Sequence, residues 1–148
     1  MIYLYLSGGL GNQMFQYAFA KTLESLTGES VTIDLSQYKI EHLHNGFELA
    51  RLFNIDLKEA PKETVELLST IPDSFIKRIQ RKFFTKPTHY IENETVFNSN
   101  VFEIQSSCYF EGYWQSEQYF YPIKNKIIDL FEFKQPLNHS TERLCSQI

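Results

Sequence analysis

One stretch of this chain sets its architecture: Ser7-Gly8-Gly9-Leu10-Gly11-Asn12-Gln13-Met14-Phe15-Gln16-Tyr17-Ala18-Phe19-Ala20. A short apolar run, Ile2–Leu6, precedes it and predicts a buried strand. Apolar residues then recur every three or four positions and predict a helix; they are Phe15, Ala18, Phe19, Leu23 and Leu26. The glycines therefore form a turn between a strand and a helix. Backbone N–H groups and the helix dipole favour an anion such as a phosphate at such a turn.

The residues after this helix predict a second strand. Gly28 is placed to end the helix, because glycine readily adopts the left-handed conformation of a helix terminus. The β-branched residues of Ser30–Ile33 follow and favour a strand. Residues 2–34 then form one βαβ unit with parallel strands and a right-handed crossover. The predicted fold class is α/β, a Rossmann-like parallel sheet with flanking helices.

The remaining chain has a less regular pattern. Residues 35–60 are predicted to be irregular, with a short helix or turn at 47–55. Strand-like residues are expected in 90–102 and a strand in 107–113. The expected helices are 62–69, the basic amphipathic segment 74–84, 117–133, and one that starts near 138 or 140.

Composition narrows the function classes. The 148 residues suffice for one domain, and the net charge of −4 argues against a general nucleic-acid binder. Cys108 and Cys145 form no CxxC or Cys/His metal spacing, and no carboxylate pair for a Mg²⁺–diphosphate site is visible, so we expect no metal; no other cofactor is expected. The 13 Phe and 9 Tyr suit either carbohydrate binding or a Phe-rich core. The run Ile2–Leu6 is too short for a signal peptide or membrane span, so we expect a cytoplasmic location.

The glycine turn by itself allows several interpretations. Gly9 and Gly11 fit a dinucleotide fingerprint, with Asp34 placed for a ribose, but Met14 stands where the third glycine belongs. A P-loop is excluded because no Gly-Lys-Ser/Thr follows. A plain tight turn remains open. The side-chain amides of Asn12 and Gln13 at the helix entrance offer donors and acceptors to a sugar hydroxyl or a phosphate oxygen.

Three strings carry a resemblance to a known family. Gly8 to Ala20 resembles the amino-terminal signature of the α-1,2-fucosyltransferases, glycosyltransferase family 11. Phe110 to Phe120, with Gly112-Tyr113-Trp114-Gln115-Ser116 at its centre, is similar to a second family signature. A weaker third likeness lies in 46–55. Two long motifs in the same order are much more specific than a lone glycine pattern, and the resemblance spans essentially the whole chain.

The resemblance implies an activity and an architecture. These enzymes transfer L-fucose from GDP-fucose to the 2-hydroxyl of a galactoside, with inversion, on a two-domain, GT-B-like frame of Rossmann-like domains. A similar glycine loop lies near the donor in related fucosyltransferases. Asn12 is the first candidate for a substrate contact and Gln13 the second, with Gly9 and Gly11 in the same loop. Some relatives carry Arg at the position of Gly9, so that charge is absent here.

The second motif offers further candidates for substrate binding. Trp114 at a strand end is suited to stack on an acceptor sugar, and Gln115 and Ser116 to bind its hydroxyls. The alternative is a core tryptophan whose N–H is satisfied by the backbone. No catalytic residue is assigned, because Asp34, Glu48 and Glu111 cannot be ranked as general bases from sequence.

One family feature is missing from the sequence. The donor-binding string His-x-Arg-Arg-Gly-Asp, whose arginines neutralise the GDP diphosphate, does not occur. We therefore expect residues 1–148 to be the amino-terminal, acceptor-side domain, with the carboxy-terminal GDP-fucose-binding domain absent and no activity in isolation. The alternative is a non-catalytic nucleotide- or sugar-binding Rossmann-like module.

The basic segment 74–84 allows one more prediction. It is suited to peripheral contact with anionic lipid at the inner membrane face. A solvated helix face explains the same pattern.

Overall fold

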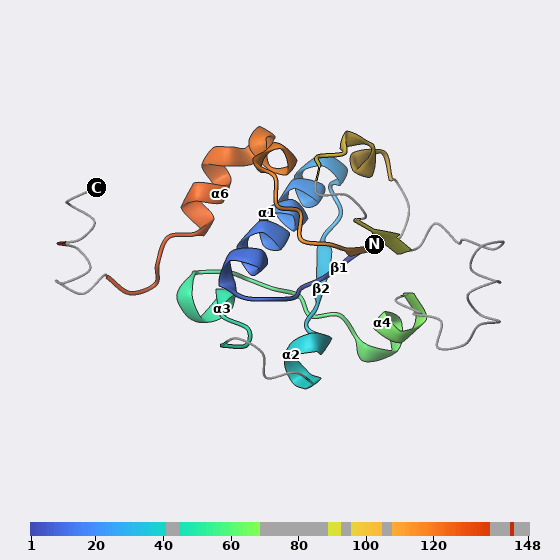
Figure 1. Cartoon of the computed structure of the whole chain (residues 1–148), viewed down its shortest axis with the longest axis horizontal. Helices are drawn as coiled ribbons and strands as arrows, with labels where there is room; N and C mark the ends of the chain where they lie inside the picture. Colours follow the sequence, from blue (N-terminus) through green and yellow to red (C-terminus); the bar gives the residue numbers. More distant parts are fainter. Residues whose placement is uncertain (41–44, 69–88, 93–95, 105–107, 137–142, 144–148) are drawn as a thin grey trace.

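The computed structural model describes residues 1–40, 45–68, 89–92, 96–104, 108–136 and 143. They form a four-stranded, all-parallel sheet in the order β2-β1-β4-β3 (Figure 1). The strands are β1 (Ile2–Tyr5), β2 (Val31–Asp34), β3 (His89–Ile91) and β4 (Cys108–Glu111). The long helix α1 (Leu10–Thr27) connects β1 to β2. The predicted α/β, Rossmann-like arrangement is confirmed.

The βαβ unit forms where the sequence predicts it. β1 and β2 pair in parallel, with Ile2 opposite Val31 and Leu4 opposite Ile33. Gly28 ends α1 in the left-handed region at φ 71°, and its N–H donates to the carbonyl of Glu24. An L-residue with a side chain rarely adopts this conformation, which explains glycine at this position.

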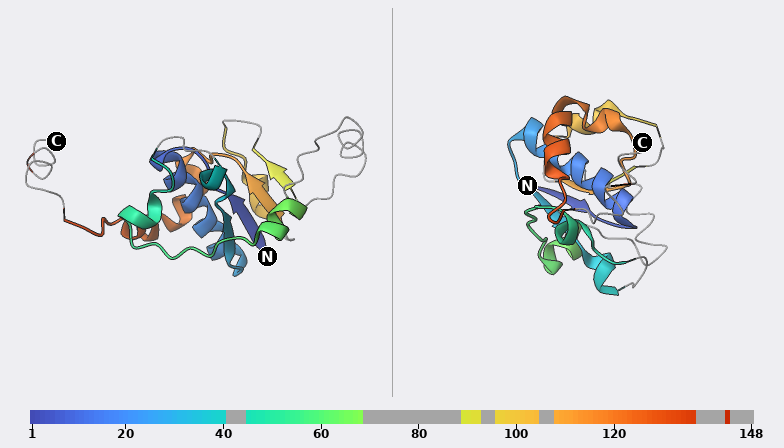
Figure 2. Two further views of the ribbon diagram at one scale, coloured as in Figure 1. Left: turned by 90° about the horizontal axis from the view of Figure 1, so that it is seen from below. Right: turned by 90° about the vertical axis from the view of Figure 1, so that its left-hand side faces the viewer.

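The two faces of the sheet differ in chemistry. Strand side chains alternate, so Ile2, Leu4 and Phe110 join α1 in the main core. On the opposite face, Tyr3 lies in register with Thr32 and Tyr109. Figure 2 shows α1 and α6 (Lys124–Leu130) on one side of the sheet, and α2 (Ser36–Ile40) and α4 (Lys62–Leu68) on the other. The sheet thus has an apolar face under α1 and a tyrosine-rich face beneath α4.

Most of the remaining predicted elements are found, with changed bounds. The helix predicted at 62–69 is α4, and α3 (Leu49–Leu52) is the short helix expected in 47–55. The strand predicted at 107–113 is β4. Within 90–102, only the beginning is strand, in β3, and Ser99–Glu103 is the 3-10 helix η1. There the Asn98 side chain accepts a bond from the N–H of Asn100 and favours a turn.

The single helix predicted at 117–133 is wrong. The structure has η2 (Glu117–Tyr119), then η3 (Tyr121–Ile123), then α6. Pro122 lies at the start of η3 and has no N–H to continue a helix begun at Glu117. Phe120, immediately before η3, leaves helical geometry at φ −125° and ψ 7°.

Some predictions concern residues outside those described. They are the basic segment 74–84 and most of the last predicted helix. Across the described part of the chain, no helix is both long enough and apolar enough to cross a membrane.

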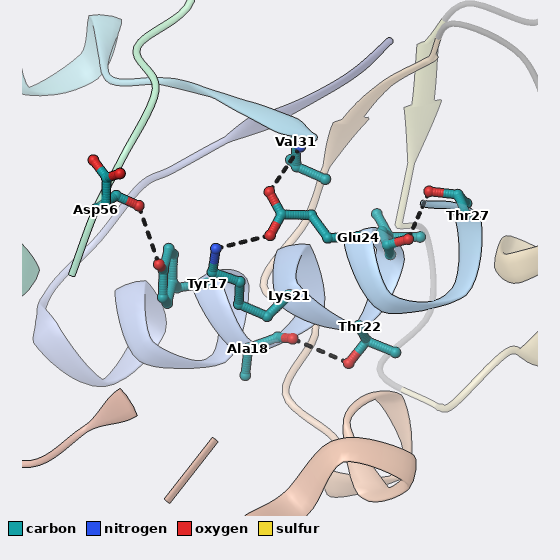
Figure 3. A network of polar contacts seen from close by, with 9 residues as sticks. Tyr17, Ala18, Lys21, Thr22, Glu24, Thr27, Val31 and Asp56 are labelled. Carbon is teal, nitrogen blue, oxygen red and sulfur yellow. Dashed lines mark hydrogen bonds and ion pairs between the residues drawn. The ribbon is translucent and has the colours of Figure 1, made fainter. Parts of the chain in front are cut away.

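A polar network fastens α1 to the β2 edge (Figure 3). The Tyr17 hydroxyl donates to the carbonyl of Asp56, and Lys21 pairs with Glu24 at 2.7 Å. The other oxygen of the Glu24 carboxylate accepts the Val31 N–H at 3.0 Å. These contacts fix the helix against the strand it precedes, so the loop at the start of α1 is held by a rigid frame.

Candidate functional site

The strand order defines where a ligand site is expected. From β1 the chain goes to β2 on one side, and it returns to β4 on the other side of β1. Parallel α/β sheets bind ligands at such a switch point, beyond the carboxyl ends of the strands. The two motif loops, 7–9 after β1 and 112–116 after β4, are both at this place.

Gly8 shapes the first loop. Its φ of 78° is in the left-handed region, and an added Cβ would lie 2.5 Å from Nδ2 of Asn12. The start of α2 holds the loop from outside, since the Tyr38 hydroxyl donates to the Gly8 carbonyl at 2.8 Å. Gly9 is the N-cap of α1 and makes no side-chain cap, and Gly11 is exposed in the first turn. The glycines therefore bring backbone and the Asn12 side chain close together.

Gln13 and Gln16 hold the loops from inside. Both side chains are fully buried. Gln13 donates to the carbonyls of Gly8 and Gly46 and accepts the N–H of Glu48, all within 2.9–3.0 Å. In this structure the Gln13 amide is thus turned into the protein and joins three segments. Gln13 therefore does not lie at the surface, where a substrate contact would require it.

Gln16 links the two motif loops directly. It accepts the Ser7 N–H and donates to the Gly112 carbonyl at 2.9 Å and to the Ser7 hydroxyl. This role of Gln16 was not predicted from the sequence. Its signal is position: Gln16 lies one helical turn after Gln13, so it continues the inward face of α1.

Asn12 and Gln115 meet on the outside. Gln115 Nε2 donates to Asn12 Oδ1 at 2.6 Å, across 103 residues of sequence. Gln115 is exposed and Asn12 half-buried. The bond uses the oxygen of Asn12 and an N–H of Gln115. Asn12 therefore presents N–H donors and Gln115 its carbonyl to a ligand at this edge.

Trp114 belongs to the core. It is 0% exposed and stacks on Phe19, with ring centroids 4.1 Å apart. The interpretation as a sugar-stacking residue is therefore wrong, because neither face of the ring is open. The core alternative holds for the ring, but its N–H finds no partner among the described residues. Its neighbours in this core include Phe110 on β4 and Tyr119 on η2.

The other predicted residues take local structural roles. The Ser116 hydroxyl accepts the N–H of Gln118 at 3.4 Å and caps η2. Asp34 accepts the Ser36 N–H at 2.8 Å and the Tyr109 hydroxyl at 2.6 Å. Burial, followed by the contact with Asp34, raises the pKa of Tyr109 far above its ordinary value. Buried and engaged, Asp34 does not face a ribose, as the dinucleotide interpretation requires.

The other two candidate general bases are likewise engaged by neighbouring side chains. Glu48 is buried and pairs with Arg51. Glu111 contacts Nε2 of His89 at 2.9 Å. The geometry therefore does not single out a base among Asp34, Glu48 and Glu111.

Two further features lie apart from the switch point. A cavity of about 210 Å³ lies beside the network of Figure 3, lined by Tyr17, Lys21 and Asp56 among others. Its cation, Lys21, is already paired with Glu24. Over the described residues, no three or more His, Cys, Asp or Glu side chains gather in a way that would hold a metal ion. The expectation that no metal is needed stays a prediction.

Comparison with known proteins adds one relative. The chain is 37% identical over 132 residues to a protein named alpha-1,2-colitosyltransferase from Escherichia coli. The match covers 85% of this chain and 43% of the relative, so the chain spans less than half the length of that protein. No family model matches the chain, and no solved structure matches it. The chain is therefore similar to a glycosyltransferase by sequence, and its fold rests on the structure described above.

Proposed function

We propose that this chain is the acceptor-side part of a glycosyltransferase that moves a 6-deoxy sugar from a GDP-linked donor to the 2-hydroxyl of a galactoside. The similarity to an alpha-1,2-colitosyltransferase supports the class of reaction. Colitose is L-fucose without one ring hydroxyl, so the family resemblance and this relative favour closely similar donors. L-Fucose from GDP-fucose is our first candidate.

One observation carries the proposal. The Asn12–Gln115 bond joins the two motif loops at the switch point of the sheet. Resemblance alone says nothing about distance, yet the fold brings both motifs to one edge. An edge with side-chain amides and an uncapped helix start suits a ligand rich in hydroxyl groups.

The reaction would be a single displacement. The acceptor hydroxyl oxygen attacks the anomeric carbon as the bond to the GDP oxygen breaks, which inverts the configuration. This chain would bind and orient the acceptor. Positive groups that stabilise the departing diphosphate would come from the carboxy-terminal domain that we expect in the whole protein. Peripheral membrane contact remains part of the proposal only as the sequence-based expectation for 74–84.

Transfer activity tests the proposal. The chain is joined to the part of the E. coli relative that it does not match and given lactose with GDP-fucose or GDP-colitose. Mass spectrometry should detect a trisaccharide with one of the two donors. Asn12→Ala should lower kcat/KM at least about tenfold, which corresponds to about 1.4 kcal/mol of transition-state stabilisation. Asn125→Ala, an exposed asparagine on α6, is the matched control and should have no effect.

Two results would contradict the proposal. One is a folded joined protein that transfers neither sugar while the intact relative is active. The other is tight GDP binding by the 148 residues alone, measured by calorimetry. That second result favours the alternative of a nucleotide-binding module.

A further inference from the structure

The loop 112–116 directs neighbouring side chains to opposite sides. Trp114 is buried in the aromatic core, whereas Tyr113 beside it is 49% exposed. No other aromatic ring of the described residues packs against Tyr113, although Trp114 contacts several. The motif thus buries the Trp114 side chain and exposes the side chain of the preceding residue, Tyr113, to solvent.

The backbone of Tyr113 is held firmly. Oε2 of Glu92 accepts the N–H of Tyr113 at 2.8 Å and that of Trp114 at 2.9 Å. Gly112 permits this approach, because a Cβ there would lie 2.5 Å from Cβ of Glu92. Trp114 has a φ of 56°, an uncommon conformation for a residue with a side chain. A phenol ring on a backbone fixed in this way loses little freedom when a ligand binds.

Other tyrosines approach the same place. The pKa of Tyr38 is raised to about 12, chiefly by burial; a hydrogen bond with Gln13 lowers it, and Tyr5, Tyr113 and Glu48 add smaller increases by charge. The Tyr38 hydroxyl donates to the Gly8 carbonyl at 2.8 Å, so Tyr38 lies at the Gly8 loop. The half-buried amide of Asn12 and the exposed amide of Gln115 meet at the same edge.

The charges at this edge disfavour an anion. The carboxylates of Glu92 and Asp34 are bound by N–H and O–H donors, and Glu48 by Arg51. Among the described residues around these loops, Arg51 contacts one of these three carboxylates, and this ion pair with Glu48 already uses its charge. A diphosphate would meet the carboxylates of Glu92 and Asp34, which oppose the attraction of the N–H groups at the start of α1, whereas a neutral ring with hydroxyl groups would meet amides and a phenol face.

We infer that Tyr113 is the surface on which a neutral pyranose ring stacks, with Asn12 donating to its hydroxyl groups and Gln115 accepting from them. This inference rests on the proposed function and deepens it. It assigns the switch-point edge to an uncharged sugar unit instead of the nucleotide diphosphate. It also gives the aromatic role predicted for Trp114 to its neighbour.

Binding to the 148-residue chain tests the inference without any need for turnover. The probes are methyl β-galactoside, methyl β-glucoside, GDP and inorganic phosphate, titrated by calorimetry. NMR saturation transfer from tyrosine ring protons to sugar protons reports the stacking directly. We expect a neutral glycoside to bind and Tyr113→Ala to raise its Kd about tenfold, the loss of about 1.4 kcal/mol. Tyr113→Phe should keep the wild-type Kd within about twofold, because the ring remains.

Tyr121→Ala is the matched control, since Tyr121 on η3 is 67% exposed and outside this group. It should leave the Kd unchanged. The inference is overturned if no neutral glycoside binds, if Tyr113→Ala binds as well as wild type, or if phosphate or GDP displaces the glycoside. Transfer assays separate this from the proposed function: glycoside binding through Tyr113 with no transfer by the joined protein contradicts the function alone.

Discussion

Four side-chain amides of the two motifs form an inner pair and an outer pair. Gln13 and Gln16, the inner amides, are fully buried, and the side chain of each makes three hydrogen bonds. Asn12 and Gln115, the outer amides, bond to each other at the surface. Adjacent residues of one motif therefore have different tasks. The inner amides hold the loops in place, and the outer ones are left to meet a ligand.

Removing an inner amide should have the largest effect on stability. Gln13→Ala and Gln16→Ala each leave a cavity and buried backbone groups without partners, such as the Gly46 and Gly112 carbonyls. We expect each to lower the free energy of unfolding by about 3–5 kcal/mol. Urea unfolding followed by circular dichroism measures this. Losses below about 1 kcal/mol would break the distinction between the pairs.

Gly8→Ala should have the next largest effect, because it alters the support beneath an outer amide. The φ of 78° and the 2.5 Å approach of an added Cβ to Asn12 Nδ2 both oppose a side chain. We expect a loss of about 1–2 kcal/mol and displacement of the Asn12 side chain.

Gly11→Ala is the matched control for this substitution. An added Cβ at Gly11 has no atom within 4 Å, and the residue is helical. This variant should be about 0.5–1 kcal/mol more stable than wild type, as helical Ala is relative to Gly. Equal effects at the two glycines would contradict the account of the turn.

Alkaline pH extends the comparison to buried groups on both faces of the sheet. Burial raises the pKa of Cys108 to about 11 and that of Tyr38 to about 12, and Tyr109 is raised too. Above their ordinary values of 9.0 and 10.0, the unfolded chain releases protons that the folded chain keeps. Stability is therefore complete below about pH 9 and falls as pH rises to 12, by about 1.4 kcal/mol per pH unit for each group.

Tyr109→Phe should make the fall of stability with pH less steep by the contribution of one titrating group, since phenylalanine does not titrate. Its stability at pH 7 should also drop by about 1–2 kcal/mol, because buried Asp34 loses the Tyr109 hydroxyl. Denaturant midpoints between pH 8 and 12 measure both effects. An unchanged slope would show that Tyr109 titrates normally in the folded protein.

The smallest stability effects are expected for the outer amides. Asn12→Ala and Gln115→Ala should change the free energy of unfolding by less than about 0.5 kcal/mol, like other surface substitutions. Gln118→Ala, an exposed glutamine nearby, is the matched control for Gln115. Thermal unfolding compares the three variants. A large loss for either outer amide would place it among the residues that hold the fold.

The sequence predicted the features that depend on residues close together in the chain. Residues 2–34 form the expected βαβ unit, because apolar spacing and Gly28 act within a few residues. The roles within the motifs were not predictable in the same way. Gln13 is positioned by Gly46, 33 residues away, and Gln16 by Gly112, 96 residues away. Burial of Trp114 depends on Phe19 in α1. Pro122 was a local signal against the long helix, and the apolar spacing around it concealed this.

The side-chain amide NMR signals of these four residues show directly which amides meet a ligand and which only hold the loops. Each amide NH₂ gives its own pair of peaks in a ¹⁵N–¹H NMR spectrum, and methyl β-galactoside is titrated into the 148-residue protein. We expect the peaks of Asn12 and Gln115 to shift and saturate together, while those of Gln13 and Gln16 remain in place. Shifts at the inner pair without shifts at the outer pair, or no shift at any of the four, would contradict it.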